Sequence, residues 1–491
     1  MSTTSAVPGA TGAELSPELL GPDGYRYRWM VLVVVMVADV MDLLDATIAN
    51  LAGPSIRHDI GGNETTLQWV LAAYTLTFAV GLITSARTGD LLGRRRLFLI
   101  GMTGFTIASL ACGLAPTAGL LIAARVAQGF FGAVMIPQGL AMVKSSFTEA
   151  DLQKAFIPFG PVMGLAAVLG PILAGFLLDA DLLGTGWRAI FWVNVPVGAV
   201  AAYLSWRYLP RNLHRHLERD PQARLDPLGT TLLTAASVTL IYPLVQGHEQ
   251  GWPGWMFAML GASAVLWAAF AVSERRATHP VIERSLTTNR AFLGGLVFLG
   301  TFFTAMSGFM LTFNLFLQYG LRFTPLHTGL ALAPWALGMA VGAAASGAAL
   351  GPKFGRRVLH GGLLVLAAGL ALVWVAVGAH GMATGGWDLA PGFFVTGLGS
   401  GAIFAPLFDI ILAGLGDNEI GSGSGVLNAV QQFCGALGVA VLGTVFFELL
   451  PGHGFADSIR DLIVIGVGCY AASFAAAFLL PKAARADGVA H

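Results

Sequence analysis

The chain has 491 residues, of which 11% are charged and 55% are hydrophobic, and its formal net charge is zero. Ordinary soluble domains carry about 25% charged residues, so this composition excludes a typical soluble protein of this length. The three cysteines lie inside apolar runs and have neither the spacing of a zinc site nor that of a disulfide framework. We therefore expect a membrane protein without a metal site.

The first 27 residues are predicted to form a cytoplasmic tail. They do not resemble a cleaved signal peptide, so the first apolar run should stay in the mature protein. An apolar run of about 20 residues can cross the ~30 Å hydrocarbon core as a helix. The sequence contains fourteen such runs, at residues 28–51, 67–87, 97–115, 118–142, 155–179, 189–209, 228–246, 254–273, 291–318, 327–350, 358–380, 388–414, 422–449 and 458–480. The predicted fold class is an all-α polytopic membrane protein with 14 transmembrane helices.

The basic residues predict the orientation of these spans. With the N-terminus inside, the cytoplasmic segments hold 22 of the 27 Lys and Arg residues and the outer loops hold four. The remaining one, Arg125, lies inside a span. Cytoplasmic loops of membrane proteins carry an excess of Lys and Arg, so both termini are predicted to be cytoplasmic.

Short stretches recur at matching places along the chain. The fourth and twelfth predicted spans contain GAVMIP at 132–137 and GAIFAP at 401–406, and the loops after the second and tenth spans share GRR at 93–95 and 355–357. A third pair, AVLG in the fifth and thirteenth spans, has a similar offset. The common offset and the common topological place indicate an internal repeat.

This repeat predicts how the chain is divided. Spans one to six and spans nine to fourteen would form two pseudo-symmetric six-helix bundles, an arrangement that many secondary transporters use to build a central binding site. The seventh and eighth spans would then be an inserted pair. The predicted parts are one bundle at 28–209, the cytoplasmic linkers with the inserted helices at 210–290, the second bundle at 291–480 and a cytoplasmic tail at 481–491.

Three aspartates, Asp39, Asp42 and Asp45, lie in the first predicted span. At 100° per residue they share an arc of about 120°, so all three can face one cavity. A charged carboxylate near the bilayer centre costs about 2.5–3.5 kcal/mol on insertion scales, so three in one helix require water, a partner or a change of protonation. This crowding makes proton uptake near neutral pH feasible. A structural polar cluster packed against another helix is the alternative.

Arg125 is the one basic residue deep inside a predicted span, and arginine does not deprotonate. It therefore needs an anionic or carbonyl partner or water, and the aspartates of the first span are natural candidates. Proton binding there could weaken the pair and trigger a conformational change, whereas a static structural pair is the alternative. All ten histidines lie in predicted loops or at span ends, so carboxylates would have to handle protons within the membrane.

Five segments, in order between residues 44 and 198, resemble motifs of the major facilitator superfamily and, within it, of the fourteen-helix drug:proton antiporters, and the resemblance covers nearly the whole chain. They are LDATIAN at 44–50, GDLLGRRR at 89–96, the stretch 121–133 with Arg125, Gln128, Gly129 and Gly132, the glycines and proline of 164–175, and the segment 187–198 that begins Trp187-Arg188. The sequence departs from these patterns at Ala86 and Ala174, where glycine is usual.

The resemblance implies roles for particular residues. Proton coupling would rest on Asp45, with Asp42, Asp39 and Arg125 beside it. The loop residues Asp90, Gly93, Arg94 and Arg95 would form a topological anchor and conformational latch. The antiporter motif would comprise Gly164, Gly170, Pro171 and Gly175, although generic helix packing explains the glycines equally well.

A substrate cavity of aromatic rings with few polar groups would suit bulky amphiphilic ligands. The candidate lining residues are Gln128, Gln138, Phe313, Asn314, Gln318, Asp409 and Gln431. Lipid contact is an equally simple reading of the phenylalanines in these spans.

The expected function is secondary transport that exports small amphiphilic drugs or natural-product antibiotics in exchange for protons. The chain has no HExxH motif and no P-loop, so we expect neither an enzyme nor a cofactor. The partners would be the substrate, protons and the lipid bilayer, without nucleic acid, and the chain would act as a monomer. An uptake symporter of the same fold and a non-transporting sensor are the alternatives. With 23 arginines against 4 lysines, the chain is expected in the inner (plasma) membrane of a high-GC bacterium.

Overall fold

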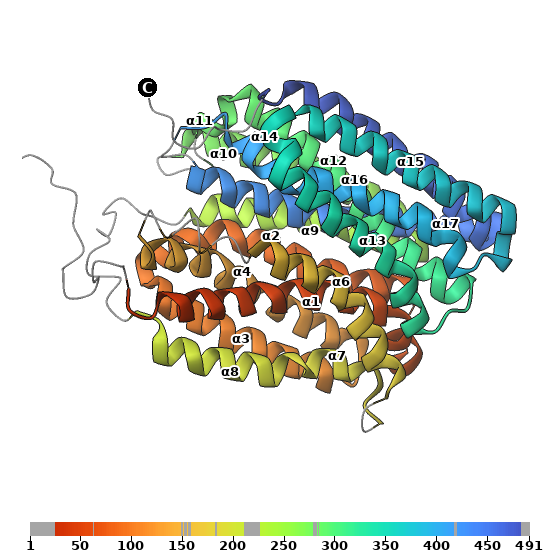
Figure 1. The fold of residues 1–491 in the computed structure, drawn as a ribbon, viewed down its shortest axis with the longest axis horizontal. Helices are drawn as coiled ribbons and strands as arrows, with labels where there is room; N and C mark the ends of the chain where they lie inside the picture. The colour runs from red at the N-terminus through yellow and green to blue at the C-terminus, as the bar shows by residue number, and fades with distance from the viewer. Residues whose placement is uncertain are drawn as a thin grey trace, which may run out of the picture.

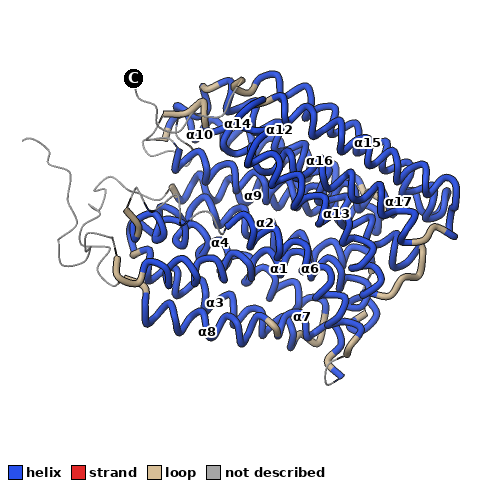
Figure 2. The backbone as a smooth tube through the Cα atoms, in the orientation of Figure 1, coloured by secondary structure: helices blue, strands red, loops and turns tan. Residues whose placement is uncertain are grey.

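The structure is a computed structural model that describes residues 25–482, apart from 62, 149–150, 152–154, 156–158, 182–183, 211–225, 278–281, 283 and 417–419. Throughout these described residues the regular elements are helices, joined mostly by short loops (Figure 2). Long apolar helices are what a lipid environment demands, because a helix satisfies its own backbone hydrogen bonds. The prediction of an all-helical polytopic membrane fold is therefore confirmed at this level.

The first part of the chain forms helices that lie side by side in the red-to-yellow region of Figure 1. They are α1 (Arg28–Ile60), α2 (Glu64–Leu92), α3 (Arg94–Leu114), α4 (Ala118–Ser146), α6 (Phe159–Asp179), α7 (Ala189–Trp192) and α8 (Asn194–Tyr208). Helix α1 packs against α2, α4, α6 and α8, which places its side chains among those of four neighbouring helices.

The rest of the chain forms the green-to-blue region of Figure 1. Its helices are α9 (Pro227–Gln250), α10 (Gly254–Arg276), α11 (Arg284–Thr288), α12 (Arg290–Leu315), α13 (Pro325–Ala345), α14 (Gly351–Phe354), α15 (Arg357–His380), α16 (Gly386–Leu412) and α17 (Ile420–Ala476). The two groups meet where α6 packs on α13 and where α2 packs on α17, and α9 contacts both α2 and α17.

Several helices begin at a residue whose side chain accepts a hydrogen bond from the first turn. Asn63, Thr117, Asp226, Asn289 and Thr324 do so for α2, α4, α9, α12 and α13. Such caps satisfy backbone N–H groups that have no partner within the helix. Local sequence therefore fixes where these helices start.

Within the described residues, 11 helices are long and apolar enough to cross a membrane. Helix α1 has 33 residues but is not among them, and it carries Asp39, Asp42 and Asp45 in its apolar stretch. Helix α17 has 57 residues and covers the predicted thirteenth span and most of the fourteenth, with a break in helical geometry at Gly454 (φ 72°, ψ 177°). The predicted sixth span is divided between α7 and α8.

Candidate functional site

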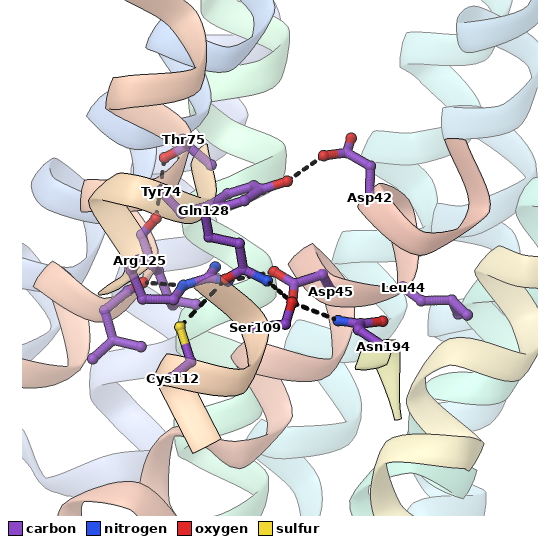
Figure 3. Close-up of polar contacts among 12 residues, drawn as sticks. Asp42, Leu44, Asp45, Tyr74, Thr75, Ser109, Cys112, Arg125, Gln128 and Asn194 are labelled. Atoms are coloured by element: carbon purple, nitrogen blue, oxygen red, sulfur yellow. Dashed lines mark hydrogen bonds and ion pairs between the residues drawn. The ribbon is translucent and has the colours of Figure 1, made fainter. Parts of the chain in front are cut away.

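The polar centre of the first group of helices is built around Asp45 of α1 (Figure 3). Asp45 has an exposed fraction of 3%, and Arg125 of α4 has an exposed fraction of 1%. The Arg125 guanidinium forms an ion pair with the Asp45 carboxylate, as the sequence interpretation suggested. Arg125 also donates from Nε to the backbone carbonyl of Val70 at 3.0 Å, so α1, α2 and α4 are joined at one point.

The second carboxylate oxygen of Asp45 also accepts hydrogen bonds. It accepts from Gln128 Nε2 at 2.7 Å and from Asn194 Nδ2 at 3.1 Å. Gln128 in turn accepts from Arg125 at 2.7 Å and donates to Ser109 Oγ at 2.8 Å. A buried ion pair offsets its desolvation cost only when its remaining donors and acceptors are satisfied. This network of five helices meets that condition.

Asp42 occupies a different environment one turn away on α1. Its carboxylate accepts from the hydroxyl of Tyr74 on α2, and the residue is half-buried, whereas Asp45 is buried. A Cβ at Gly132 of α4 would lie 3.5 Å from Asp42 Oδ1, so the absence of a side chain there leaves room beside the carboxylate. Asp39, a further turn along, is also half-buried, and its charge faces that of Asp42.

The predicted latch loop lies between α2 and α3. Gly93 has φ 108°, a backbone conformation that favours glycine, and separates the two helices. Arg95 donates to the carbonyls of Trp206 at 2.7 Å and Leu209 at 3.1 Å, at the end of α8. Arg94 opens α3, and the position of the Asp90 side chain lies outside the described part of the structure. A role in gating stays a prediction.

The predicted antiporter motif lies in α6. Pro171 is inside this helix, and a Cβ at Gly170 would lie 2.7 Å from Thr47 Oγ1 of α1. A Cβ at Gly175 would lie 2.6 Å from the Cα of Leu326 on α13. These glycines therefore permit close packing, which is the structural interpretation left open above. Gly164 lies in the same helix.

The predicted cavity residues fall in several places. Gln128 belongs to the Asp45 network, and Gln138 is buried and donates to the Ser85 carbonyl at 2.9 Å. Phe313 is buried in an aromatic cluster, 5.4 Å from Phe309 between ring centroids.

Asn314 and Gln318 join the two groups of helices. Asn314 donates to the backbone carbonyl of Asn50, and Gln318 donates to that of Leu51 at 2.8 Å, both on α1. Asp409 is exposed on α16 and Gln431 is half-buried on α17. Contact of any of these residues with substrate stays a prediction.

Sequence reasoning missed Tyr74 and Ser109 and treated Asn194 only as part of a motif. All three are buried polar residues within otherwise apolar helices. A polar residue within an apolar helix was the signal in the sequence that could have found them, because a polar group buried in a lipid-spanning segment needs a partner. Their partners were not readable, since they come from helices distant in sequence. The described residues contain no group of three or more His, Cys, Asp or Glu side chains that could hold a metal ion.

Comparisons with known proteins agree with this architecture. Residues 35–439 match the Major Facilitator Superfamily. A probable actinorhodin transporter of Streptomyces coelicolor is 45% identical over 441 residues, covering 89% of this chain and 75% of the relative. The puromycin resistance protein of Streptomyces alboniger is 38% identical over 429 residues, covering 87% and 82%. A crystal structure of a POT family transporter in complex with a thioalcohol-conjugated peptide superposes with a TM-score of 0.65 at 15% identity, covering 91% and 95%, which shows a shared fold.

Proposed function

Since this chain belongs to the Major Facilitator Superfamily and is a transporter rather than an enzyme, we propose that it exports small amphiphilic drugs or natural-product antibiotics in exchange for protons. The observation that carries the proposal is the half-buried carboxylate of Asp42 beside the buried Asp45–Arg125 pair. A charged group at membrane depth is costly, and such groups commonly mark proton or substrate pathways. The names of the relatives, for actinorhodin transport and puromycin resistance, support an antibiotic as the cargo.

We propose fourteen membrane-spanning helices for this transporter. The 11 candidate spans include α17 as one helix, and dividing it at Gly454 adds one. Helix α1, with 33 residues, and helix α6, with 21 residues, are both long enough to cross the bilayer and add one span each, which gives fourteen. The start of α1 and helix α14 lie at the same end of the molecule (Figure 1), which supports cytoplasmic termini together with the distribution of Lys and Arg.

The packing supports two related six-helix bundles, as the internal repeat predicts. Helices α3 and α4 pack together as α15 and α16 do, and α2 packs on α4 as α13 packs on α16. Between the groups, α6 packs on α13 and α17 packs on α2. In the repeat, α6 corresponds to the first part of α17 and α2 corresponds to α13, so the two contacts are related by the same twofold symmetry. Helices α9 and α10 stand outside this correspondence, so we propose that they are the inserted pair.

Alternating access would then move one bundle against the other. The contacts of Asn314 and Gln318 with α1 close the end of the molecule at which α1 terminates. Under the proposed topology this is the outer end. The transporter would work as a monomer in the plasma membrane, without a cofactor or nucleic acid, and the proton gradient would drive it.

Everted membrane vesicles that are acid inside provide the test. Adding actinorhodin, puromycin or ethidium outside should release protons from vesicles that contain the wild-type protein, because an exporter would carry the drug inward as protons leave. Asp45→Asn should abolish this release, and Arg207→Lys on the cytoplasmic end of α8 serves as the control. An uptake symporter would instead release protons together with drug only from preloaded vesicles, and that result would reject the proposal.

A further inference from the structure

Tyr74 is positioned between the two parts of the carboxylate cluster (Figure 3). Its hydroxyl donates to Asp42 Oδ1, and its ring centroid lies 4.2 Å from the guanidinium carbon of Arg125. The residue is buried on α2, so its ring has little freedom to take another position. A guanidinium over an aromatic face is attracted by the ring quadrupole. Tyr74 therefore contacts the half-buried carboxylate and the buried ion pair at the same time.

Building on the proposed function, we infer that Asp42 is the carboxylate that loads the transported proton, and that Tyr74 is a positioning residue that transmits this event to the Arg125–Asp45 pair. Asp45 would then hold Arg125 in place and would not carry the proton itself. The two carboxylates, one helical turn apart, would thus have different roles: Asp42 binds the proton and Asp45 binds Arg125.

The hydrogen bonds argue against proton loading on Asp45. Its two oxygens accept from Arg125, Gln128 and Asn194. Protonation would weaken these bonds and leave the Arg125 guanidinium buried without a counter-charge, which is strongly unfavourable. Asp42 is partly accessible to solvent, so a proton can reach it from water, and its loss of charge leaves no buried cation unpaired.

The surrounding charges explain how the event can be transmitted. The groups that face Asp42 are Asp39 and Asp45 on its own helix, Tyr74 on α2 and Arg125 on α4. When Asp42 is charged, its carboxylate holds the Tyr74 hydroxyl. When Asp42 takes a proton, the charge-assisted hydrogen bond becomes a weaker neutral one. The ring is then less firmly held against Arg125, and one of the negative charges that face Arg125 is gone.

Variants at Tyr74 separate its two contacts. Tyr74→Phe removes the hydroxyl but keeps the ring over Arg125, and Tyr74→Leu removes both. Tyr470→Phe is the matched control, because Tyr470 is a buried tyrosine that packs on Phe302 and Phe309 in the other group of helices. Thermal unfolding of each purified variant in detergent checks that it is folded.

Infrared pH titration of the carboxylic acid band of the purified full-length protein tests the assignment without any transport. Because the chain has 27 acidic residues, the band of Asp42 is identified in the difference between the wild-type and Asp42→Asn spectra, where the bands of the other carboxyl groups cancel. In Tyr74→Phe its midpoint should move about one pH unit towards alkaline pH, because a hydrogen bond that stabilises the charged form is lost. Tyr470→Phe should titrate as the wild type does. A difference spectrum without a titrating carboxylic acid band, or an unchanged midpoint in Tyr74→Phe, would overturn the inference.

Drug-evoked proton release from vesicles then gives the second readout. The pH at which the rate is half-maximal should move in the same direction in Tyr74→Phe, and Tyr74→Leu should lose at least tenfold in proton release. A pH profile unchanged in both variants would also overturn the role of Tyr74. A wild-type protein whose Asp42 band titrates but which releases no protons with any drug would reject the proposed antiport. Asp42 would then be shown to bind a proton that is not exchanged for drug.

Discussion

The guanidinium of Arg125 contacts four partners on three different helices. It pairs with Asp45, donates to Gln128 and to the carbonyl of Val70, and lies over the ring of Tyr74. A lysine ammonium is a point charge without the planar fork that these partners require. Arg125→Lys keeps the positive charge beside Asp45 but loses donors to Gln128 and Val70, so it should destabilise the protein by about 1–3 kcal/mol and should reduce drug export. Thermal unfolding and vesicle transport measure the two effects. Wild-type stability in this variant would contradict the described network.

Asp59 provides a contrasting pair at the end of α1. It accepts from Arg188 at 2.5 Å and from Trp187 Nε1 at 2.9 Å, and these bonds lower the pKa of the Asp59 carboxyl below its ordinary value. A lowered folded-state pKa stabilises the protein above the unfolded-state pKa, and this contribution is lost as the pH falls through the folded value. The pair is largely exposed, so Asp59→Asn should cost less than about 1 kcal/mol at pH 7.

The pH dependence distinguishes this pair from a neutral contact. The difference in unfolding temperature between wild type and Asp59→Asn should shrink as the pH falls below about 4, where the free carboxyl becomes protonated. Unfolding temperatures measured across that range provide the check. A difference that stays constant with pH would show that the charge of Asp59 contributes nothing.

At the scale of helices, α6 and α13 approach each other closely at two glycines, Gly175 and Gly329. A Cβ at Gly329 would lie 2.4 Å from the carbonyl oxygen of Pro171, a distance at which the backbone itself must move. Overpacking of this kind costs about 1–3 kcal/mol. Gly329→Val should therefore lower the unfolding temperature, whereas Gly361→Val on α15, where a Cβ meets nothing within 4 Å, should not. Equal effects of both variants would show that this contact does not depend on glycine.

The existence of the helices was easier to predict from sequence than their ends. Long apolar runs specify a spanning helix whatever its neighbours, so each predicted span overlaps a described helix. The first span was predicted to end at residue 51, but α1 continues to Ile60 because polarity alone does not terminate a helix. By contrast, the polar segment between the predicted thirteenth and fourteenth spans does coincide with a break, since Gly454 leaves helical geometry within α17. These boundaries depend on packing and on backbone geometry that composition does not record.

At the scale of the whole molecule, sequence predicted which groups carry charge inside the membrane but not how they divide their roles. The pairing of Arg125 with the first helix followed from the cost of an isolated charge. The difference in burial between Asp42 and Asp45, and the place of Tyr74 between them, depend on how α2 and α4 are set against α1. The bond from Gln318 to the α1 backbone joins segments 267 residues apart, and sequence alone does not indicate it; its predicted place in a substrate cavity stays a prediction.

The end of the molecule that we propose to be the outer one is closed by contacts between the two groups of helices. Besides Asn314 and Gln318, the Asp179 carboxylate of α6 accepts from the backbone N–H of Leu326 on α13 at 3.2 Å. Helix α9 adds a further link, because His248 lies 3.7 Å from Glu64 of α2 and 3.0 Å from Glu448 of α17. Helix α9 is thus attached to both groups at this end.

Closure of this kind should be measurable from outside the cell. In a cysteine-free background, a reporter Asn50→Cys lies behind the contacts made by Asn314 and Gln318 on α1. Replacing both with alanine removes two hydrogen bonds worth about 1 kcal/mol each, so an impermeant thiol reagent should label the reporter roughly tenfold faster or more. Thr312→Ala is the control, since Thr312 bonds the carbonyl of Gly308 within its own helix. If the double variant were labelled no faster than this control, the bonds to α1 would not hold the outer end closed.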